Sequence, residues 1–394
     1  MKVKKISLKK NNNFSKNYSH KNNSQKNSSF ASKNSVSKDK EKASYKGEKI
    51  YVGLDVHKKS WKVAIWLRDD IVEVFSQNSD PEILLRHLKR FYAQAEYYSA
   101  YEAGFCSFWV HRALRTLGIR NIVVNAADIP TKDKERQNKT DPVDARKLAR
   151  ELSKGNLEAI HVPSEESQGE RTLLRTRSQF TSKMTRCKNQ IKGLLNQYGI
   201  KVPEGDEGME QNWSGRYIDY LGHLEFKNKC VRLSLDMLLE ELQSLRSIIL
   251  KMNREIRKLS RNEKYGKISE SLHSIRGIST TSGMMIATEL DEIRRFRDLD
   301  GLSKYVGLVP SEHSSGEREK KGSLSKRKNN HLRKILIEIS WVAVRYDGTL
   351  KSMFLKYQNR MNKKKAIIKI ARHVLSRIMY VLRTGEPIKM IQAA

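Results

Sequence analysis

The chain has 394 residues, 38% of them hydrophobic, with 77 Lys and Arg against 44 Asp and Glu and a formal net charge of +33. This length allows two or three domains with real cores, and the charge favours a polyanionic partner, above all nucleic acid. No apolar run approaches the ~20 residues of a membrane span, the start lacks the apolar core of a signal peptide, and the three cysteines lie in no ligand spacing, so we expect a cytoplasmic protein without a zinc or disulfide framework.

Residues 1–48 are a low-complexity mixture of Lys, Asn and Ser. They contain 13 lysines and three acidic residues, a net charge of +10, which leaves +23 for the rest of the chain. Such a segment cannot bury enough apolar surface to fold, and it predicts a disordered basic tail. Because most of the positive charge lies outside this tail, the folded part must also attract polyanions.

Residues 49–162 have the pattern of an α/β domain. Short runs rich in β-branched and aromatic residues alternate with amphipathic stretches, and Asp80-Pro81 supplies a helix cap and a first helical residue. The order of elements, βββαβαβα, is that of an RNase H-like fold, in which the first strand is central and the fourth pairs beside it. The expected strands are 49–58, 60–69, 71–78, 95–104 and 120–126, and the expected helices are 81–95, 105–117 and one that begins at Asp141.

Four acidic residues fall where predicted elements of this domain begin or end: Asp55, Glu102, Asp141 and Asp144. In the first strand, alternation places Asp55 on the face opposite the apolar residues, beside Gly53, which leaves space for a metal ion and a phosphate. Glu102 ends the fourth strand, and the last two acids share one side of a first helical turn. Four carboxylates would repel a polyanion unless metal ions lay between them, and they suit two Mg²⁺ ions.

Each carboxylate also has an ordinary structural interpretation. Asp141 as helix cap, Pro142 as first helical residue and Asp144 in the first turn make a good helix start in any protein. His57 could assist proton transfer or be a surface histidine. The joint occurrence of the four acids in this order of elements favours the metal site.

Residues 163–264 predict two long helices. Apolar residues recur at steps of three and four from Phe180 to Tyr198, and again from Val231 to Leu259. About four heptads of this kind in the second helix are typical of a coiled-coil seam. Two possibilities follow: a dimerisation or spacer arm, or two helices that pack on each other within one chain.

Residues 265–394 predict a mainly α-helical domain. The stretch 271–290 has a glycine turn between two apolar helices, as in part of a helix-hairpin-helix, so the turn either contacts phosphate or serves helix packing. A highly polar loop is expected over 311–331. Helices are expected over 332–346 and 363–382.

A series of motifs resembles the IS110/IS1111 family of insertion-sequence transposases and the related Piv-type DNA invertases. The motifs run in order from about residue 48 to the C-terminus: GLDVHKKSWKVAI, YEAG, KTDPVDARKLA, SIRGI, YVGLVPSEHSSGE, SLSKRKNNHLRKILI and KKKAIIKIARHVL. The resemblance implies a RuvC-like DEDD domain, a coiled-coil arm and a C-terminal transposase domain, in a prokaryotic, nucleoid-associated protein. Its DEDD residues, which hold Mg²⁺, would be Asp55, Glu102, Asp141 and Asp144.

The same resemblance implies a nucleophilic serine in a short Ser-Gly motif after a Gly-Leu-x-Pro turn. That turn is 307–310, and the serine is Ser315, with the adjacent Ser314 as the alternative. Taken alone, Ser-Ser-Gly is an ordinary turn sequence. A serine hydroxyl that attacks a phosphodiester would conserve bond energy in a phosphoserine link, until the hydroxyl of another strand reseals it.

The resemblance further implies donor and target DNA, a structured non-coding bridge RNA and a homo-oligomer, either a dimer or a tetramer. The charge of +23 outside the tail fits DNA with or without RNA equally well. Basic residues around the serine motif are candidate phosphate contacts, or simply a solvated basic face: Lys320, Lys321, Lys326, Arg327 and Arg333.

Two other kinds of function stay open from the sequence. One is a metal-dependent nuclease of the Holliday-junction type or a site-specific DNA invertase. The other is a non-catalytic basic protein that packages nucleic acid. A covalent protein–DNA adduct would separate the serine recombinase from the nuclease, and loss of activity on replacing Asp55 or Glu102 would exclude the packaging protein.

Overall fold

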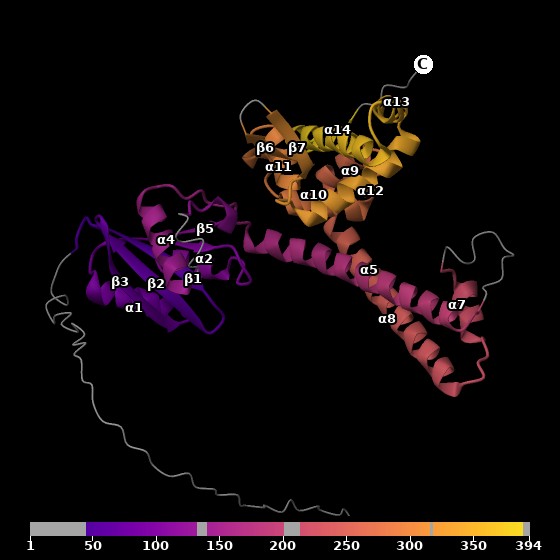
Figure 1. Cartoon of the computed structure of the whole chain (residues 1–394), viewed down its shortest axis with the longest axis horizontal. Helices are drawn as coiled ribbons and strands as arrows, with labels where there is room; N and C mark the ends of the chain where they lie inside the picture. The colour runs from indigo at the N-terminus through magenta and orange to yellow at the C-terminus, as the bar shows by residue number, and fades with distance from the viewer. Residues whose placement is uncertain (1–44, 132–139, 201–212, 316–317, 389–394) are drawn as a thin grey trace, which may run out of the picture. The chain divides into compact units, whose positions relative to one another are not determined.

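The computed structural model describes residues 45–131, 140–200, 213–315 and 318–388, with the backbone alone described over 311–315 and 318–322. The chain divides into two compact units, Met1–Val162 and Pro163–Ala394, which run from indigo to magenta and from magenta to yellow in Figure 1. The tail predicted over 1–48 lies outside the described residues, except for residues 45–48. None of the described helices is long and apolar enough to cross a membrane.

The first unit is an α/β fold built around one mixed sheet. Its elements are β1 (Lys49–Val56), β2 (Ser60–Leu67), β3 (Asp70–Asn78), α1 (Pro81–Phe91), β4 (Glu96–Glu102), α2 (Trp109–Thr116), β5 (Arg120–Val124), η2 (Ala126–Asp128) and α4 (Asp141–Ser153). The strand order is β3-β2-β1-β4-β5, and β1 pairs antiparallel with β2 and parallel with β4. The expected central first strand, with the fourth beside it, is confirmed. A mixed sheet with flanking helices is compatible with an RNase H-like fold.

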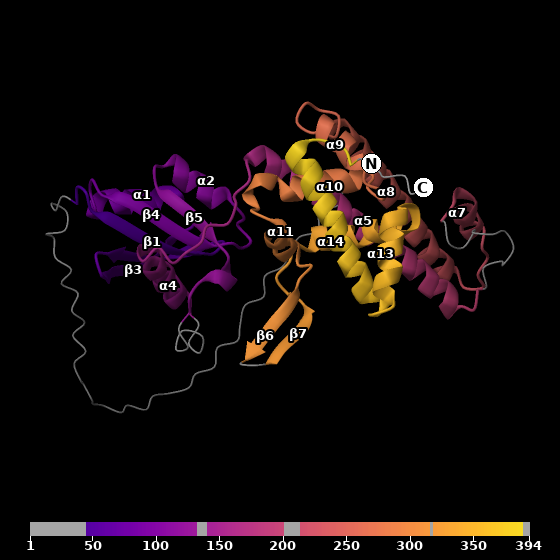
Figure 2. The same ribbon diagram turned by 90° about the horizontal axis from the view of Figure 1, so that it is seen from above.

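Helices cover both faces of this sheet (Figure 2). Val52 and Leu54 of β1 are buried in an apolar core that also contains residues of α1 and α2. On the other face, Ala145 and Ala149 of α4 pack beside a small residue of β2. Successive residues of β1 therefore face opposite layers, as the period of two in a strand requires.

Gly53 allows α4 to lie very close to β1. A Cβ atom on Gly53 would overlap the carbonyl oxygen of Ala145 and lie 2.5 Å from the backbone nitrogen of Ala149. The prediction that this glycine leaves space for a metal ion is therefore wrong, because the backbone of α4 fills that space. The glycine instead holds the first turns of α4 against the strand that carries Asp55.

The second unit is mainly helical. Its elements are α5 (Glu165–Gln197), α7 (Gly215–Gly222), α8 (Lys229–Leu259), α9 (Gly266–His273), α10 (Thr280–Leu290), η3 (Ile293–Arg295), α11 (Leu299–Val306), β6 (Pro310–Ser315), β7 (Arg318–Leu324), α12 (Asn330–Tyr346), α13 (Gly348–Gln358) and α14 (Lys363–Thr384). The helices from α9 to α14 share one apolar core.

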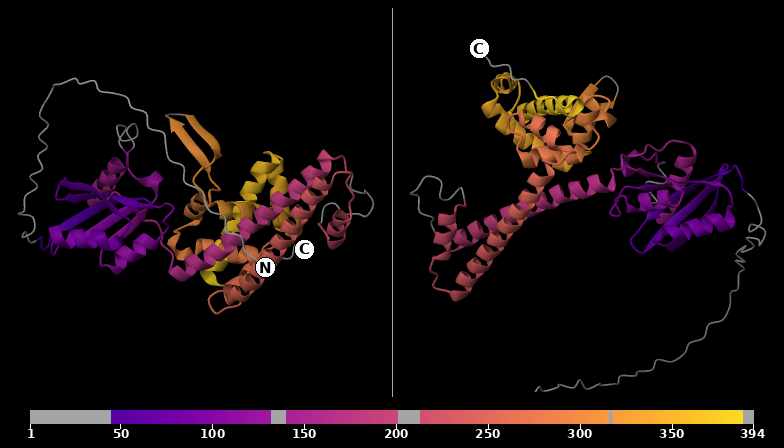
Figure 3. Two further views of the ribbon diagram at one scale, coloured as in Figure 1. Left: turned by 90° about the horizontal axis from the view of Figure 1, so that it is seen from below. Right: turned by 180° about the vertical axis from the view of Figure 1, so that it is seen from behind.

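The helices α5 and α8 pack against each other along much of their length (Figure 1), and Figure 3 shows the same pair from behind. One apolar cluster joins Ile191 of α5 to Leu239 and Leu242 of α8, and a second cluster contains Leu174 and Ile256. Of the two possibilities drawn from the sequence, packing within one chain is the arrangement that the structure contains.

The glycine turn between α9 and α10 is used for helix packing. Gly277 has a φ of +94°, and a Cβ atom there would lie 2.7 Å from the carbonyl oxygen of Ile339 in α12. The next helix begins with a capping box, in which the Ser279 N–H donates to the hydroxyl of Ser282 at 2.7 Å. These contacts favour the packing interpretation of this turn over a phosphate contact.

The polar segment after α11 is not the loop that the sequence predicted. It forms the two-stranded antiparallel hairpin β6–β7, and a further helix, α13, lies between the two predicted helices of the C-terminal part. The hairpin was missed because its residues show no apolar alternation, while the pairing itself needs only backbone groups. It presents the serine motif at the end of β6.

Candidate active site

The four carboxylates lie at or near the ends of neighbouring elements in the first unit. Asp55 is close to the end of β1, and Glu102 is the last residue of β4, its parallel neighbour. Asp141 is the first residue of α4, and Asp144 lies in the first turn of the same helix. Since α4 packs on β1, the topology gathers all four at one edge of the sheet.

The structural interpretation of Asp141 as the cap of helix α4 is off by one residue. The cap residue is Thr140, whose side chain makes no capping hydrogen bond, and Asp141 is the first helical residue. The carboxylate of Asp141 is therefore not used to close the helix end, and 55% of its side chain is exposed. It is available to a ligand.

His57 joins two of the carboxylates. Its Nε2 lies 3.1 Å from Oδ2 of Asp55 and 3.5 Å from Oδ2 of Asp141. One potential ligand atom from each of these three residues lies within 4.8 Å of the others, which is the spacing of a group that can hold a metal ion. His57 is a surface histidine, with 51% of its side chain exposed, and it also adjoins both carboxylates; its part in proton transfer stays a prediction.

Lys147 joins the other two carboxylates. Its Nζ lies 3.0 Å from Oδ1 of Asp144 and 3.9 Å from Oε1 of Glu102, and the residue is only 7% exposed. This lysine was not predicted as part of the site, although its position three residues after Asp144 places both residues on one side of the helix. The four carboxylates thus form two pairs, each with a basic side chain between its members.

The electrostatics of Asp55 suit a cation. Burial raises the pKa of its carboxyl group, and the neighbouring carboxylates of Asp141 and Asp144 raise it further, against the opposing effect of His57. A positive charge beside Asp55 would stabilise its ionised form. Carboxylate oxygens are also the donors that hard divalent cations prefer.

The serine motif lies in the second unit, at the end of β6. Ser315 is the last residue of this strand and is opposite Arg318 of β7 in the register, while Ser314 is opposite Glu319. The predicted contacts Lys320 and Lys321 belong to β7. The side chains of these two lysines and of both serines lie outside the described residues.

The base of the hairpin is fixed by hydrogen bonds. The guanidinium of Arg333 donates to the carbonyl oxygen of Gly307 and, at 2.8 Å, to that of Ser325, and the Ser325 N–H donates to the carbonyl oxygen of Val309 at 3.0 Å. Burial lowers the pKa of Arg333. Nη2 of Arg333 thus connects the two ends of the hairpin, and a contact between this residue and phosphate stays a prediction. Lys326 and Arg327 lie exposed on the segment beside it.

Comparison with known proteins matches both regions that carry these residues. A family model for DEDD transposases of the IS110 type, described as "Transposase", matches residues 52–200. A second model, described as "Transposase IS116/IS110/IS902 family", matches residues 269–355. The chain belongs to the IS110/IS1111 family of transposases. It is a DNA transposase, and DNA is its substrate.

Several curated relatives support this assignment. The chain is 28% identical to "Putative transposase y4qE" of Sinorhizobium fredii, over 74% of this chain and 71% of that protein. It is 26% identical to "Transposase for insertion sequence element IS1111A" of Coxiella burnetii, over 64% of this chain and 68% of that protein. It is 23% identical to "Transposase for insertion sequence element IS1533" of Leptospira borgpetersenii, over 62% and 71% of the two chains.

The region matched by the DEDD model contains all four carboxylates of the transposase, and the second matched region contains Ser315. A DEDD domain indicates the use of a divalent metal. The group of Asp55, His57 and Asp141 offers such an ion a site in this structure. The donor set and the family assignment therefore agree.

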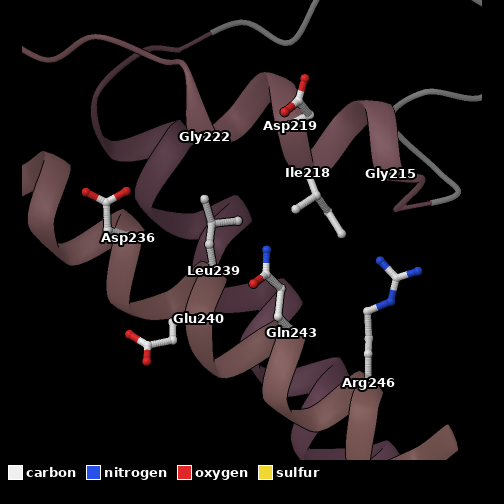
Figure 4. A pocket seen from close by; sticks show the side chains of 9 residues that line it. All are labelled: Gly215, Ile218, Asp219, Gly222, Asp236, Leu239, Glu240, Gln243 and Arg246. Atoms are coloured by element: carbon white, nitrogen blue, oxygen red, sulfur yellow. The ribbon is translucent and has the colours of Figure 1, made fainter.

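A pocket of about 510 Å³ in the second unit of the transposase contains none of the predicted site residues. It lies between α7 and α8, where Gln243 and Arg246 extend from α8 toward α7 (Figure 4). Its rim includes Asp219 and Glu240, so both signs of charge are present. This mixed lining does not resemble the uniformly basic surface that a nucleic-acid strand requires.

Proposed function

We propose that this transposase cuts and rejoins DNA strands with Ser315 as nucleophile and with Mg²⁺ held by Asp55, Glu102, Asp141 and Asp144. The observation that carries the proposal is the gathering of these carboxylates at one sheet edge. The second region that matches a family model also contains a serine at the end of a hairpin strand. We also propose that a bridge RNA guides the choice of donor and target DNA. The protein would then act in the prokaryotic cytoplasm, on the nucleoid.

The carboxylates have separate parts in this proposal. Asp55 and Asp141 supply oxygen ligands whose spacing suits one cation, with His57 as an adjoining donor. Glu102 and Asp144 would exchange the ammonium group of Lys147 for a second cation. When bound, Mg²⁺ supplies positive charge that favours an ionised hydroxyl and offsets the charge that accumulates on the reacting phosphate.

The serine step conserves the number of phosphodiester bonds. The Oγ of Ser315 forms a bond to phosphorus while the bond from phosphorus to the leaving strand breaks, and the serine proton passes by way of solvent to the leaving oxygen. The hydroxyl of another strand then attacks the same phosphorus, the Oγ–P bond breaks, and the serine hydroxyl is restored. No external energy source is required, because each new bond replaces an equivalent one.

We further propose that the active form is a homo-oligomer, in which each active site combines a DEDD domain with a Ser315 hairpin from the same or another copy. The two regions belong to separate compact units of the chain, so their combination can be arranged by assembly. The paired helices α5 and α8 are our candidates for the coiled-coil arm that contacts another copy. Sequencing of RNA that copurifies with the protein would test the bridge RNA directly.

Replacement of Ser315 tests the chemical mechanism. Wild-type protein incubated with its DNA and Mg²⁺ should give a protein–DNA adduct that survives a denaturing gel, and Ser315→Ala should give none, because no other group forms the phosphoserine link. Ser314→Ala is the matched control and should retain the adduct. If the adduct is lost in Ser314→Ala instead, Ser314 is the nucleophile. If both variants cleave DNA at the wild-type rate and no adduct forms, water is the nucleophile and the enzyme is a nuclease of the Holliday-junction type.

Replacement of Lys147 tests the second pair of carboxylates. We expect Mg²⁺ to raise the melting temperature of Lys147→Met more than that of the wild type, because the ammonium group no longer competes with the ion for Asp144 and Glu102. Each additional kcal/mol of binding free energy corresponds to about 4 °C. Thermal unfolding with EDTA and with excess Mg²⁺ measures the difference. Lys154→Met, at the exposed end of the same helix, is the control, and equal shifts in both variants would contradict this account.

A further inference from the structure

The last two described helices, α13 and α14, carry one sign of charge. The segment from Gly348 to Gly385 contains ten Lys and Arg and no Asp or Glu. Three of the ten bind groups from other elements: Arg372 contacts Asp300, Arg377 contacts Asp347, and Arg383 donates to backbone carbonyls. Among the described residues, the other seven form no ion pair: Lys351, Lys356, Arg360, Lys363, Lys364, Lys365 and Lys369.

The first turn of α14 also carries only positive charge, at the end of the helix where positive charge is unfavourable. Its first turn contains Lys363, Lys364 and Lys365 and no acidic residue. The N-terminal end of a helix is already positive, so three lysines there repel both the helix dipole and one another. A bound anion would relieve this repulsion.

A pocket of about 320 Å³ opens beside this basic surface. Residues 369, 372, 373 and 376 of α14 follow the spacing i, i+3, i+4 and i+7, so they lie on one side of the helix. Leu299, the first residue of α11, and Tyr357, near the end of α13, complete the wall. The full lining is Leu299, Tyr357, Lys369, Arg372, His373 and Ser376.

The polar groups around this pocket are held in place by contacts with one another. The Tyr357 hydroxyl lies 2.9 Å from Nε2 of His373, and the two rings are stacked with their centroids 6.1 Å apart. Lys369 places its Nζ 5.1 Å from the centroid of the Tyr357 ring, and Arg372 is oriented by its 2.7 Å contact with Asp300. The donors are therefore arranged before any ligand arrives, which lowers the entropy lost on binding.

We propose that this pocket binds a phosphate of a nucleic-acid backbone, with Lys369, Arg372 and Ser376 as its donors, and that the lysines at the start of α14 contact neighbouring phosphates of the same strand. Phosphate is favoured because the lining combines a guanidinium, an ammonium and a hydroxyl. A strand is favoured over a single small anion because Lys365, which is exposed, lies four residues before Lys369 and seven before Arg372, so the positive charge on this side of α14 continues beyond the pocket. The inference extends the proposed function by naming a surface that holds its substrate.

Binding measurements at several salt concentrations test this site. The full chain is titrated against labelled duplex DNA and, separately, against a labelled RNA hairpin, in EDTA and between about 50 and about 200 mM salt. For a strand that occupies the pocket, Lys369→Gln should reduce the slope of log K against log salt by about 1, and Lys369→Gln combined with Arg372→Gln by about 2. Lys369→Arg keeps the positive charge, so its slope should equal that of the wild type.

The matched control removes two lysines of the same unit that lie outside the proposed surface. Lys258→Gln combined with Lys334→Gln neutralises exposed lysines of α8 and α12 and should leave the slope close to the wild-type value. If the slope falls with DNA but not with RNA, the ligand is a DNA strand. If it falls with RNA but not with DNA, the ligand is an RNA strand. If neither probe responds, or if the control pair responds as strongly as the pocket pair, the proposal is wrong.

This test is independent of the chemistry proposed above. Binding in EDTA requires neither metal nor Ser315, so Ser315→Ala should bind as the wild type does, whatever its mechanism. Lys369 is exposed and forms no ion pair with any residue that the structure describes, so Lys369→Gln should fold normally, which unchanged thermal unfolding would verify. The single variant therefore keeps the proposal testable even if loss of the Arg372–Asp300 contact destabilises the double variant.

Discussion

Asp55→Asn is expected to reduce strand cleavage by more than about 100-fold. Replacing a residue that only hydrogen-bonds to a metal ligand already lowers metal affinity or activity by about 10- to 100-fold, and Asp55 is proposed as a ligand itself. The substitution keeps the size of the side chain but replaces a charged oxygen ligand by a neutral amide. Potential ligand atoms of Asp55, His57 and Asp141 lie within 4.8 Å of one another. The substitution therefore removes one of the three ligands from the only group of this kind among the described residues. Cleavage of DNA in the presence of Mg²⁺ measures the effect.

Asp69→Asn is the matched control for this prediction. Asp69 lies exposed in the turn between β2 and β3 of the same unit, and its replacement should leave cleavage unchanged. DNA binding in EDTA should be the same for both variants, because neither residue is proposed to contact phosphate directly. A protein that only packages nucleic acid would lose nothing in either variant, and that outcome would refute the enzymatic role of the carboxylates.

The part of the site that depends on local sequence was predictable. Alternation along β1 placed Asp55 opposite the apolar residues, and the Pro142 signal placed the start of α4 at Asp141. The sheet order followed from the order of elements, because an RNase H-like arrangement puts β4 beside β1. Periodicity and helix-start signals are local properties, so a single sequence suffices to detect them.

The part that depends on close packing was not predictable. Gly53 was interpreted as space for a ligand, whereas it allows a helix far along the chain to approach. Lys147 was overlooked because an isolated lysine in a helix is usually solvated, and only the packing of α4 on the sheet buries it. The hairpin was missed for a related reason: β-pairing of polar residues leaves no hydrophobic pattern to detect.

Glu289 is another residue whose role follows from tertiary contacts alone. It lies in the apolar stretch of α10 and is fully buried. Arg175 of α5 donates to its two carboxylate oxygens at 2.5 and 2.8 Å, and the Asn329 amide donates at 2.7 Å. Asn329 also caps α12 through its side-chain oxygen. One carboxylate thus connects α5, α10 and the start of α12.

Glu289→Gln is therefore expected to lower the free energy of unfolding by about 2–3 kcal/mol. Breaking a buried ion pair usually costs about 3–5 kcal/mol, and the lower value applies because 42% of the Arg175 side chain is exposed and can be rehydrated. Urea unfolding of the full chain measures the change. Glu270→Gln, at an exposed position of α9, is the control and should change stability by no more than about 0.5 kcal/mol.

The same ion pair predicts a pH dependence with a definite sign. Burial alone would raise the pKa of Glu289, but the hydrogen bonds from Arg175 and Asn329, with the charge of Arg175, outweigh it, so the pKa is lowered. A carboxyl group with a lowered pKa in the folded state stabilises the protein above its unfolded pKa of about 4.3, and this contribution is lost as the pH falls through the folded pKa. The difference in unfolding free energy between the wild type and Glu289→Gln should therefore be constant at neutral pH and shrink in acid below about pH 4.3. A difference that grows as the pH falls would mean that Glu289 is protonated in the folded protein at neutral pH, and the assigned ion pair would then be incorrect.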